Sequence, residues 1–180
     1  YLPSGYHLGF AAVAALEPYI DAIVLDQQAH WCLEHAAILS ELPIFRFAHC
    51  DVDSLNNVLE EMPGQTRPLI MSDGVFATTG RMPPLDKYAE LAEAYDGQML
   101  VDESHAAGVL GDTGRGAAQH LGLTSRVHVA STLSKGFCSQ GAVFCGTEEM
   151  ISRANKTPAI RGSNQGSPIS AEVAAAALEY

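Results

Sequence analysis

Short apolar runs alternate with helix-like stretches along almost the whole chain, and this alternation constrains the fold more than any other feature. Six runs predict strands, at 22–26, 44–49, 67–73, 98–103, 127–132 and 142–146. Several are almost continuously apolar, as is typical of parallel strands that are covered on both faces. Helical patterns occupy 9–20, 30–40, 53–62, 85–96 and 147–155. The sequence therefore predicts an α/β fold with a central, mainly parallel sheet sandwiched by helices.

The length fits one folding unit. The chain has 180 residues, enough for a compact domain with a substantial core. No repeat, low-complexity segment or linker divides it, so we expect a single domain over residues 1–180. Both ends look cut, since 170–180 stops inside an alanine-rich helix without a C-cap residue. We therefore expect a piece of a longer protein. Asp53 is expected to cap the helix at 53–62.

Charge and composition exclude several classes of partner. Acidic residues number 21 against 10 basic ones, which gives a net charge of -11. Such a surface repels nucleic acid and anionic membranes, although a local pocket can still bind a small anion. No apolar run approaches the ~20 residues of a membrane span, and no signal peptide is visible. The four cysteines have no metal-site spacing, so we expect no metal, reduced thiols and a cytoplasmic protein.

The first stretch whose residues could take part in catalysis or binding is "VDESHAAGVLGDTGRG", residues 101–116. Asp102 and His105 come where the apolar strand 98–103 ends, and ligands of open parallel sheets bind outside the carboxyl ends of the strands. The glycines that follow let the backbone turn sharply. Taken alone, Asp102 is equally well explained as a helix cap or a loop anchor.

The second stretch is "STLSKGF", residues 131–137, which follows the next apolar strand. It places Lys135 among hydroxyls that could hold a phosphate, those of Ser131, Thr132 and Ser134. By itself Lys135 could be a solvated surface lysine. Together, a strand-end lysine and the strand-end Asp102 match the needs of pyridoxal phosphate, which takes an amine for a Schiff base and a carboxylate for its pyridine nitrogen.

Two further segments could complete such a site. In "LDQQAHW" (25–31), His30 follows a strand and could lie flat against an aromatic ring, or it could simply cap the next helix. In "SGYHLGF" (4–10), Gly5 and Tyr6 precede a helix, and exposed amides at a helix start suit a phosphate.

The proposed lysine and carboxylate have opposite electrostatic requirements. A lysine amine, whose ordinary pKa is ~10.4, must lose its proton before it attacks an aldehyde, so the site must disfavour the ammonium form. An ionised Asp102 would keep the ring nitrogen protonated and make the ring an electron sink. Once displaced by the substrate amine, Lys135 could act as a general base. His105 could help to polarise the reacting group.

The two stretches, in this order and separation, resemble the α-oxoamine synthases, which are fold-type I pyridoxal-phosphate enzymes. The resemblance also includes "SGYHLGFAAVAAL", "LDQQAHW", "FAHCDVDSL" and "SDGVFATTGRMPPL", so it runs nearly end to end. It implies the family's central large domain, with the N-terminal arm and the C-terminal small domain absent from this chain. It also implies condensation of a small amino acid with an acyl-CoA and loss of carbon dioxide by a homodimer.

Carried over by position, the resemblance assigns a role to each candidate residue. Lys135 would hold the cofactor covalently and Asp102 would pair with its ring nitrogen. His30 would stack on the ring, while His105 and Thr132 would contact cofactor oxygens. The phosphate would lie at Gly5 and Tyr6. In "RGSNQGSP" (161–168), Ser163 or Asn164 would reach the phosphate of a partner subunit.

The chain departs from the family pattern at several positions. Ala77 stands where the family has a serine that donates to the cofactor's ring oxygen, and Gly9 replaces an asparagine. Trp31 and Cys32 replace small residues after the stacking histidine, and Cys138 replaces a glycine. Two alternatives therefore stay open. One is another fold-type I activity, an aminotransferase or an aldolase, and the other is a non-catalytic scaffolding subunit or fragment.

Overall fold

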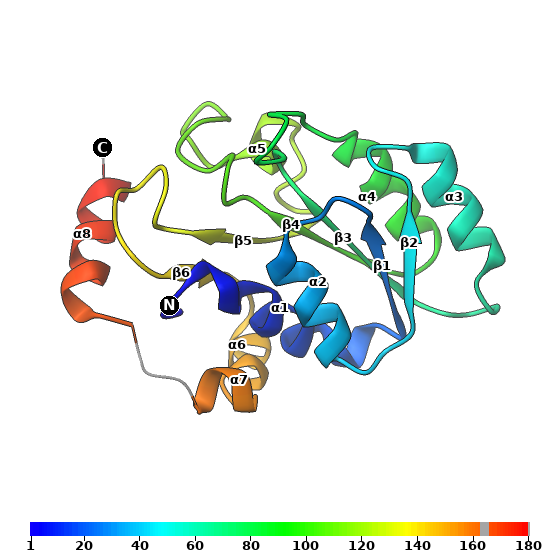
Figure 1. Cartoon of the computed structure of the whole chain (residues 1–180), viewed down its shortest axis with the longest axis horizontal. Helices are drawn as coiled ribbons and strands as arrows, with labels where there is room; N and C mark the ends of the chain where they lie inside the picture. Colours follow the sequence, from blue (N-terminus) through cyan, green and yellow to red (C-terminus); the bar gives the residue numbers. More distant parts are fainter. Residues whose placement is uncertain (163–165, 180) are drawn as a thin grey trace.

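The chain folds around one six-stranded sheet (Figure 1). The computed structural model describes residues 1–162 and 166–179. The strand order is β2-β1-β3-β4-β5-β6, in which the first five are parallel and β6 runs antiparallel to β5. The strands span, in chain order, β1 Ala22–Asp26, β2 Ile44–Phe47, β3 Pro68–Asp73, β4 Gln98–Asp102, β5 His128–Thr132 and β6 Ala142–Phe144.

Helices cover both faces of the sheet (Figure 1). One face carries α1 (Leu8–Leu16), α2 (Trp31–Leu39), α6 (Glu148–Ala154) and α7 (Pro158–Arg161). The other carries α3 (Val52–Glu61), α4 (Leu85–Ala94) and α5 (Ala117–His120). The last helix, α8 (Pro168–Leu178), lies beyond the β5–β6 end of the sheet and buries only Ala174. The expected sandwich of helices around a mainly parallel sheet is confirmed.

Alternating side chains of the central strands feed two separate cores. In β1, Ile23 and Leu25 pack with the α1 side, whereas Ala22 and Val24 pack with the α3 side. Every residue of β1 is buried. This explains why the strand reads as a continuous apolar run: side chains on both faces lie in a core.

The predicted elements agree with the observed ones apart from local differences. The short helices α5 and α7 were not predicted, because four residues are too few to show a helical period. The predicted cap of α3 is wrong. Asp51, not Asp53, is the N-cap, and its carboxylate accepts a hydrogen bond of 2.9 Å from the Ser54 amide. Asp53 lies inside the first turn, where its negative charge still suits the helix dipole.

Close packing of α1 on α2 brings the residues that precede α1 next to the start of α2. A Cβ at Gly9 would lie 2.7 Å from the Cys32 carbonyl oxygen and 2.9 Å from the Ala36 Cβ. Only glycine therefore fits this helix crossing without displacement. The crossing places the Gly5–Tyr6 segment that precedes α1 next to the start of α2.

Within residues 1–162 and 166–179, no helix has the length and apolar character that a bilayer crossing requires.

Candidate active site

Seven of the candidate binding residues from the sequence line one cavity of about 230 Å³ at the carboxyl edge of the sheet: Gly5, Tyr6, His30, Asp102, Thr132, Ser134 and Lys135. Asp102 and Thr132 end the neighbouring strands β4 and β5, and Lys135 follows three residues after β5. Three more residues complete the lining: Ser4, Cys32 and Ser104. The cavity thus brings an amine, a carboxylate, an imidazole and several hydroxyls together.

Asp102 is a buried carboxylate held by its neighbours. Its side chain accepts a hydrogen bond of 2.9 Å from the Ser104 amide at Oδ1, and the Cys32 thiol donates to Oδ2 over 3.5 Å. The residue is only 2% exposed. Burial first, and then the Asp102 charge, raise the pKa of the Cys32 thiol, so this thiol stays protonated and acts as a donor. Asp102 is therefore fixed in direction before any ligand arrives.

A second buried carboxylate, Asp73, lies beside the first. It ends β3 and is the register partner of Asp102. Its Oδ2 accepts a hydrogen bond of 2.9 Å from the His30 amide. Burial, and next the charge of Asp102, raise the pKa of Asp73 to about 8. One of the two acids therefore keeps a proton at neutral pH while no cation lies between them.

His30 serves as the N-cap of α2, which is one of the two explanations that the sequence allowed. Its Nδ1 accepts a hydrogen bond of 3.2 Å from the Cys32 amide and lies 3.0 Å from the Cys32 sulfur. The side chain is otherwise exposed and lines the cavity. Capping and stacking do not exclude each other, because the cap uses one ring nitrogen and leaves the ring face open.

Lys135 lies in the loop after β5 as an exposed residue on the cavity lining. Its amine forms no hydrogen bond or ion pair with the residues that the structure describes. Its positive charge nevertheless acts on the site, since it limits the rise in the pKa of Asp73. Burial first, and then the charge of Lys135, lower the pKa of His105, which lies outside the cavity lining. The neutral form of the His105 imidazole is therefore favoured.

Three hydroxyls gather at the Gly5 end of the cavity. The Thr132 hydroxyl donates to the Gly141 carbonyl over 3.0 Å and lies 2.8 Å from the Ser134 hydroxyl. The Ser4 hydroxyl accepts a hydrogen bond of 3.1 Å from the Tyr6 amide. The Tyr6 amide and the Thr132 hydroxyl proton are thus already engaged, and the hydroxyls of Ser4 and Ser134 are the groups that this end offers to an anion.

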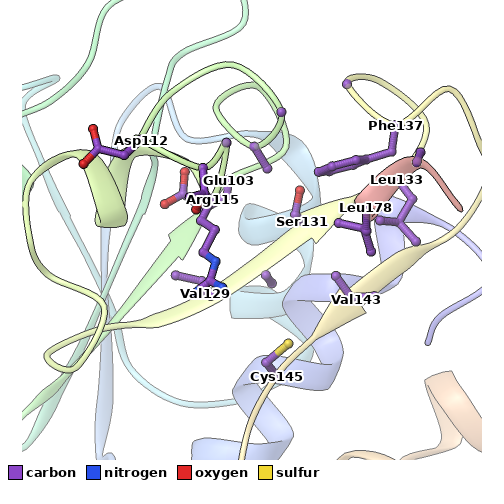
Figure 2. A pocket seen from close by; sticks show the side chains of 17 residues that line it. Glu103, Asp112, Arg115, Val129, Ser131, Leu133, Phe137, Val143, Cys145 and Leu178 are labelled. Atoms are coloured by element: carbon purple, nitrogen blue, oxygen red, sulfur yellow. The ribbon is translucent and has the colours of Figure 1, made fainter. Parts of the chain in front are cut away.

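Not every residue that the sequence suggested reaches this cavity. Ser131 lines a different and larger cavity of about 920 Å³, because successive side chains of β5 point to opposite faces of the sheet. Figure 2 shows Leu133, Phe137 and Leu178 among the apolar residues of that larger cavity. The sequence suggested that Ser131, Thr132 and Ser134 act together. The structure separates Ser131 from the other two. Ser163 and Asn164 lie outside the described residues.

A smaller cavity of about 130 Å³ adjoins the other side of His30. Asp73 and Trp31 line it, together with Phe76, Ala77, Thr78 and Thr79. Trp31 is 71% exposed, so its indole is not part of a core. Ala77 brings no hydroxyl to this space, whereas Thr78 and Thr79 do.

Comparison with known proteins places this geometry in a family. The profile described as aminotransferase class I and II matches residues 2–180. The chain belongs to the aminotransferase class I and II family. A putative 8-amino-7-oxononanoate synthase of Nostoc sp. (strain PCC 7120 / SAG 25.82 / UTEX 2576) is 37% identical over 178 residues, which cover 97% of this chain and 46% of the relative. An 8-amino-7-oxononanoate synthase of Thermosipho melanesiensis is 37% identical over 99% of this chain and 46% of the relative.

Solved structures show the same fold. A serine palmitoyltransferase of Sphingomonas wittichii superposes with a TM-score of 0.91 at 24% identity, over 99% of this chain and 45% of that one. An 8-amino-7-oxononanoate synthase of Francisella tularensis superposes with a TM-score of 0.79 at 26% identity, over 99% of this chain and 52% of that one. The relatives named 8-amino-7-oxononanoate synthase confirm the resemblance to the α-oxoamine synthases within this aminotransferase family. The chain spans about half the length of the relatives it matches.

Three residues of the two cavities that His30 lines were not predicted from the sequence to belong to the site. Asp73 carries a weak signal, since it also ends an apolar run, but its pairing with Asp102 depends on strand register. Cys32 meets Asp102 across 70 positions of sequence, and a lone cysteine gives no pattern to detect. The Ser104 contact could have been found, because an aspartate side chain commonly accepts a hydrogen bond from the backbone amide two residues on.

Proposed function

We propose that the whole protein is a pyridoxal-phosphate-dependent acyltransferase of the α-oxoamine synthase type. In this proposal it condenses a small amino acid with an acyl-CoA and releases carbon dioxide. The observation that supports the proposal most is the shared cavity of Lys135 and Asp102, with His30 on the same lining. The similarity to relatives named 8-amino-7-oxononanoate synthase supports it independently.

The residues present fit the cofactor on the chemistry of their donors. Asp73 and Asp102 are buried side by side, and burial first, then the charge of Asp102, raise the pKa of Asp73. A protonated pyridine nitrogen would add a positive charge beside these two acids. Asp102 would hold that nitrogen, Lys135 would hold the aldehyde carbon, and His30 would cover the ring face. The hydroxyls of Ser4 and Ser134 would bind the phosphate, beside Thr132, which holds the Gly141 carbonyl.

In this proposal, Asp102, Lys135 and His105 each have a separate role in the reaction. When bound, the cofactor withdraws electrons from the α-carbon of the amino acid. Asp102, fixed by Ser104 and Cys32, would keep the ring nitrogen protonated throughout. Lys135, whose amine is free of ion pairs with the described residues, would take and return the proton at the α-carbon. His105, with its lowered pKa, would stay neutral and offer a ring nitrogen as a hydrogen-bond partner.

A covalent-attachment assay tests the cofactor part. The full-length protein purified with pyridoxal phosphate should show a visible absorbance band that borohydride bleaches, and Lys135→Ala should abolish the band. The chain has two other lysines, Lys87 and Lys156, and these give matched controls. Lys87 pairs with Glu90 on the surface, so Lys87→Ala should keep the band. A band that survives Lys135→Ala would contradict the proposal.

The reaction class needs its own assay. Amino acids and acyl-CoAs are offered together, and the release of free CoA is compared with keto-acid formation. CoA release that depends on Lys135 supports the acyltransferase. Exchange of amino groups without CoA release would favour the aminotransferase alternative, to which the missing hydroxyl at Ala77 gives some support. Absence of both reactions in a protein that binds the cofactor would favour a scaffolding role.

We also propose a homodimer that shares its active sites and works in the cytoplasm. The thiols of Cys32, Cys50, Cys138 and Cys145 are free, in line with a reducing compartment. Sedimentation of the full-length protein would give the oligomeric state. A monomer with full activity would contradict the shared site.

A further inference from the structure

A second group of chemically active side chains lies at the carboxyl edge of the sheet, outside the candidate active site. Asp26 ends β1, while His49 and Cys50 lie in the turn between β2 and α3. Together they offer a carboxylate, an imidazole and a thiol, with all three candidate ligand atoms within 4.8 Å of one another. None of them lines the 230 Å³ cavity, so the proposed function leaves this group without a role.

The spacing of these atoms approaches that of a tetrahedral metal centre. The Cys50 sulfur lies 3.5 Å from Nε2 and 3.7 Å from Nδ1 of His49. The His49 Nδ1 lies 2.9 Å from the Asp26 Oδ1. Zinc bonds of ~2.3 Å to sulfur and ~2.0–2.1 Å to nitrogen or oxygen imply edges of ~3.6 Å for N···S and ~3.4 Å for N···O. The sulfur–imidazole edge therefore already matches, the carboxylate–imidazole edge needs to open by ~0.5 Å, and the sulfur–carboxylate edge is within 4.8 Å.

The scaffold holds the carboxylate and the thiol without help from a ligand. The side chain of Asp26 is fully buried, and it accepts hydrogen bonds from the Gln28 amide at 2.8 Å and from the Cys50 amide at 3.0 Å. The second of these bonds helps to keep Cys50 at φ 55°, a left-handed conformation that costs a side-chain-bearing residue ~1–2 kcal/mol. Such strain is retained where surrounding contacts fix it.

The donor set selects the class of ion. Ca²⁺ and Mg²⁺ take oxygen ligands, whereas a thiolate and an imidazole suit zinc and its neighbours among the transition metals. We propose that Asp26, His49 and Cys50 bind one divalent transition-metal ion of the Zn²⁺ class, with water in the fourth position. On binding, Cys50 loses its thiol proton to solvent, and His49 binds as the neutral imidazole through Nδ1, with its one ring proton moved through solvent from Nδ1 to Nε2. The ion would join the ends of β1 and β2 to the start of α3.

Cobalt(II) is the probe, because a cobalt–thiolate bond gives a charge-transfer absorbance band that oxygen and nitrogen ligands do not give. The full-length protein is loaded with pyridoxal phosphate, stripped with a chelator and titrated with Co²⁺ and then Zn²⁺. One equivalent of Co²⁺ should produce the band, and Zn²⁺ should displace it. Cys50→Asn should abolish the band and weaken Zn²⁺ binding ~100-fold or more, beyond the ~10–100-fold effect of losing an outer-shell partner.

Asparagine is chosen because it tolerates the left-handed conformation at position 50, so the turn can form without the thiol. Thermal unfolding of the metal-free Cys50→Asn variant should match that of the metal-free parent. The second control is Cys32→Ser, since His30, Cys32 and Asp102 also place ligand atoms within 4.8 Å of one another. This variant should keep the band.

The outcomes separate clearly. A band lost in Cys50→Asn and in His49→Ala but kept in Cys32→Ser supports the site. A band that is lost only in Cys32→Ser, or no stoichiometric band in the parent protein, overturns the proposal. No activity is measured, so the result stands apart from the proposed function.

Discussion

Asp73 and Asp102 face each other across β3 and β4 as register partners, each only 2% exposed. Two carboxylates buried side by side do not both ionise easily, and the pKa of Asp73 rises to about 8. Asp73 therefore carries the proton at neutral pH and still accepts the His30 amide bond.

The paired acids predict a pH-dependent stability that Asp73→Asn removes. Between the unfolded pKa of ~3.9 and the folded value of about 8, the folded protein holds a proton that the unfolded chain releases. The free energy of unfolding therefore falls as pH rises through this window, by at most ~1.4 kcal/mol per pH unit. Asparagine keeps an acceptor for His30 but does not ionise. The free energy of unfolding of the cofactor-free protein is measured in urea from pH 5 to 8.5. As pH rises, this free energy should increase in the variant relative to the parent.

A matched control for this titration is Asp21→Asn. Asp21 is exposed, and its hydrogen bond from Arg67 lowers its pKa to about 2. The stability that it contributes is present above pH ~4 and is lost only as pH falls toward 2. The difference between Asp21→Asn and the parent should therefore stay constant from pH 5 to 8.5. A constant difference for Asp73→Asn as well would contradict the raised pKa.

The close contact of Gly5 with Thr132 predicts that Gly5→Ala weakens cofactor binding. A Cβ at position 5 would lie 2.9 Å from both Cβ and Oγ1 of Thr132. Thr132 is buried and bonded to the Gly141 carbonyl, so it has no space to move away. Overpacking of this kind costs ~1–3 kcal/mol, and ~1.4 kcal/mol is a 10-fold loss of affinity. Titration of pyridoxal phosphate by absorbance measures the loss. Gly64→Ala, with no atom within 4 Å of the new methyl group, should bind as the parent does.

The Cys32 thiol predicts a difference between two substitutions. Cys32→Ala removes the donor that Asp102 Oδ2 receives, whereas Cys32→Ser replaces it with a hydroxyl. Without the donor the carboxylate becomes a stronger base, so the pH midpoint of the bound cofactor's absorbance should rise in the alanine variant and stay near the parent value in the serine variant. The alanine variant should also lose ~1–2 kcal/mol of unfolding free energy. Equal midpoints in all three proteins would show that the thiol only fills space.

The sequence contains enough information for the sheet but not for all of the site. Apolar runs identify the strands because β1 and β3 are buried on both faces, and strand ends identify Asp102 and Thr132 because ligands meet parallel sheets there. The face of a strand is harder to predict. Ser131 and Thr132 look equivalent in sequence, yet the pleat sends them to different cavities.

Contacts between distant segments are the other part that sequence reasoning misses. Asp26 and His49 are 23 positions apart, and only the parallel pairing of β1 with β2 brings them together. The same holds for Asp73 and Asp102. Such pairs follow from strand order and register, which one sequence without relatives does not specify.

The buried Glu103 predicts a structural effect that leaves the cofactor untouched. Its two carboxylate oxygens accept the Ala117 and Ala118 amides at the start of α5, at 2.8 and 2.7 Å. A glutamine offers one acceptor, so one amide would face an NH₂ group, at a cost of ~1–3 kcal/mol in unfolding free energy. The side chain belongs to the larger cavity (Figure 2), so Glu103→Gln should keep the absorbance maximum of bound pyridoxal phosphate.

The control for Glu103 is a glutamate whose carboxylate is hydrogen-bonded at the solvent-exposed surface. Glu93 pairs with Arg126 at 2.7 Å, with 55% of its side chain exposed. Exposed ion pairs contribute ~0–1 kcal/mol, so Glu93→Gln should destabilise by no more than that. Urea unfolding compares the two variants directly. If Glu103→Gln proved as mild as Glu93→Gln, the start of α5 would not depend on the buried carboxylate, and the glycine loop that leads to it would need another anchor.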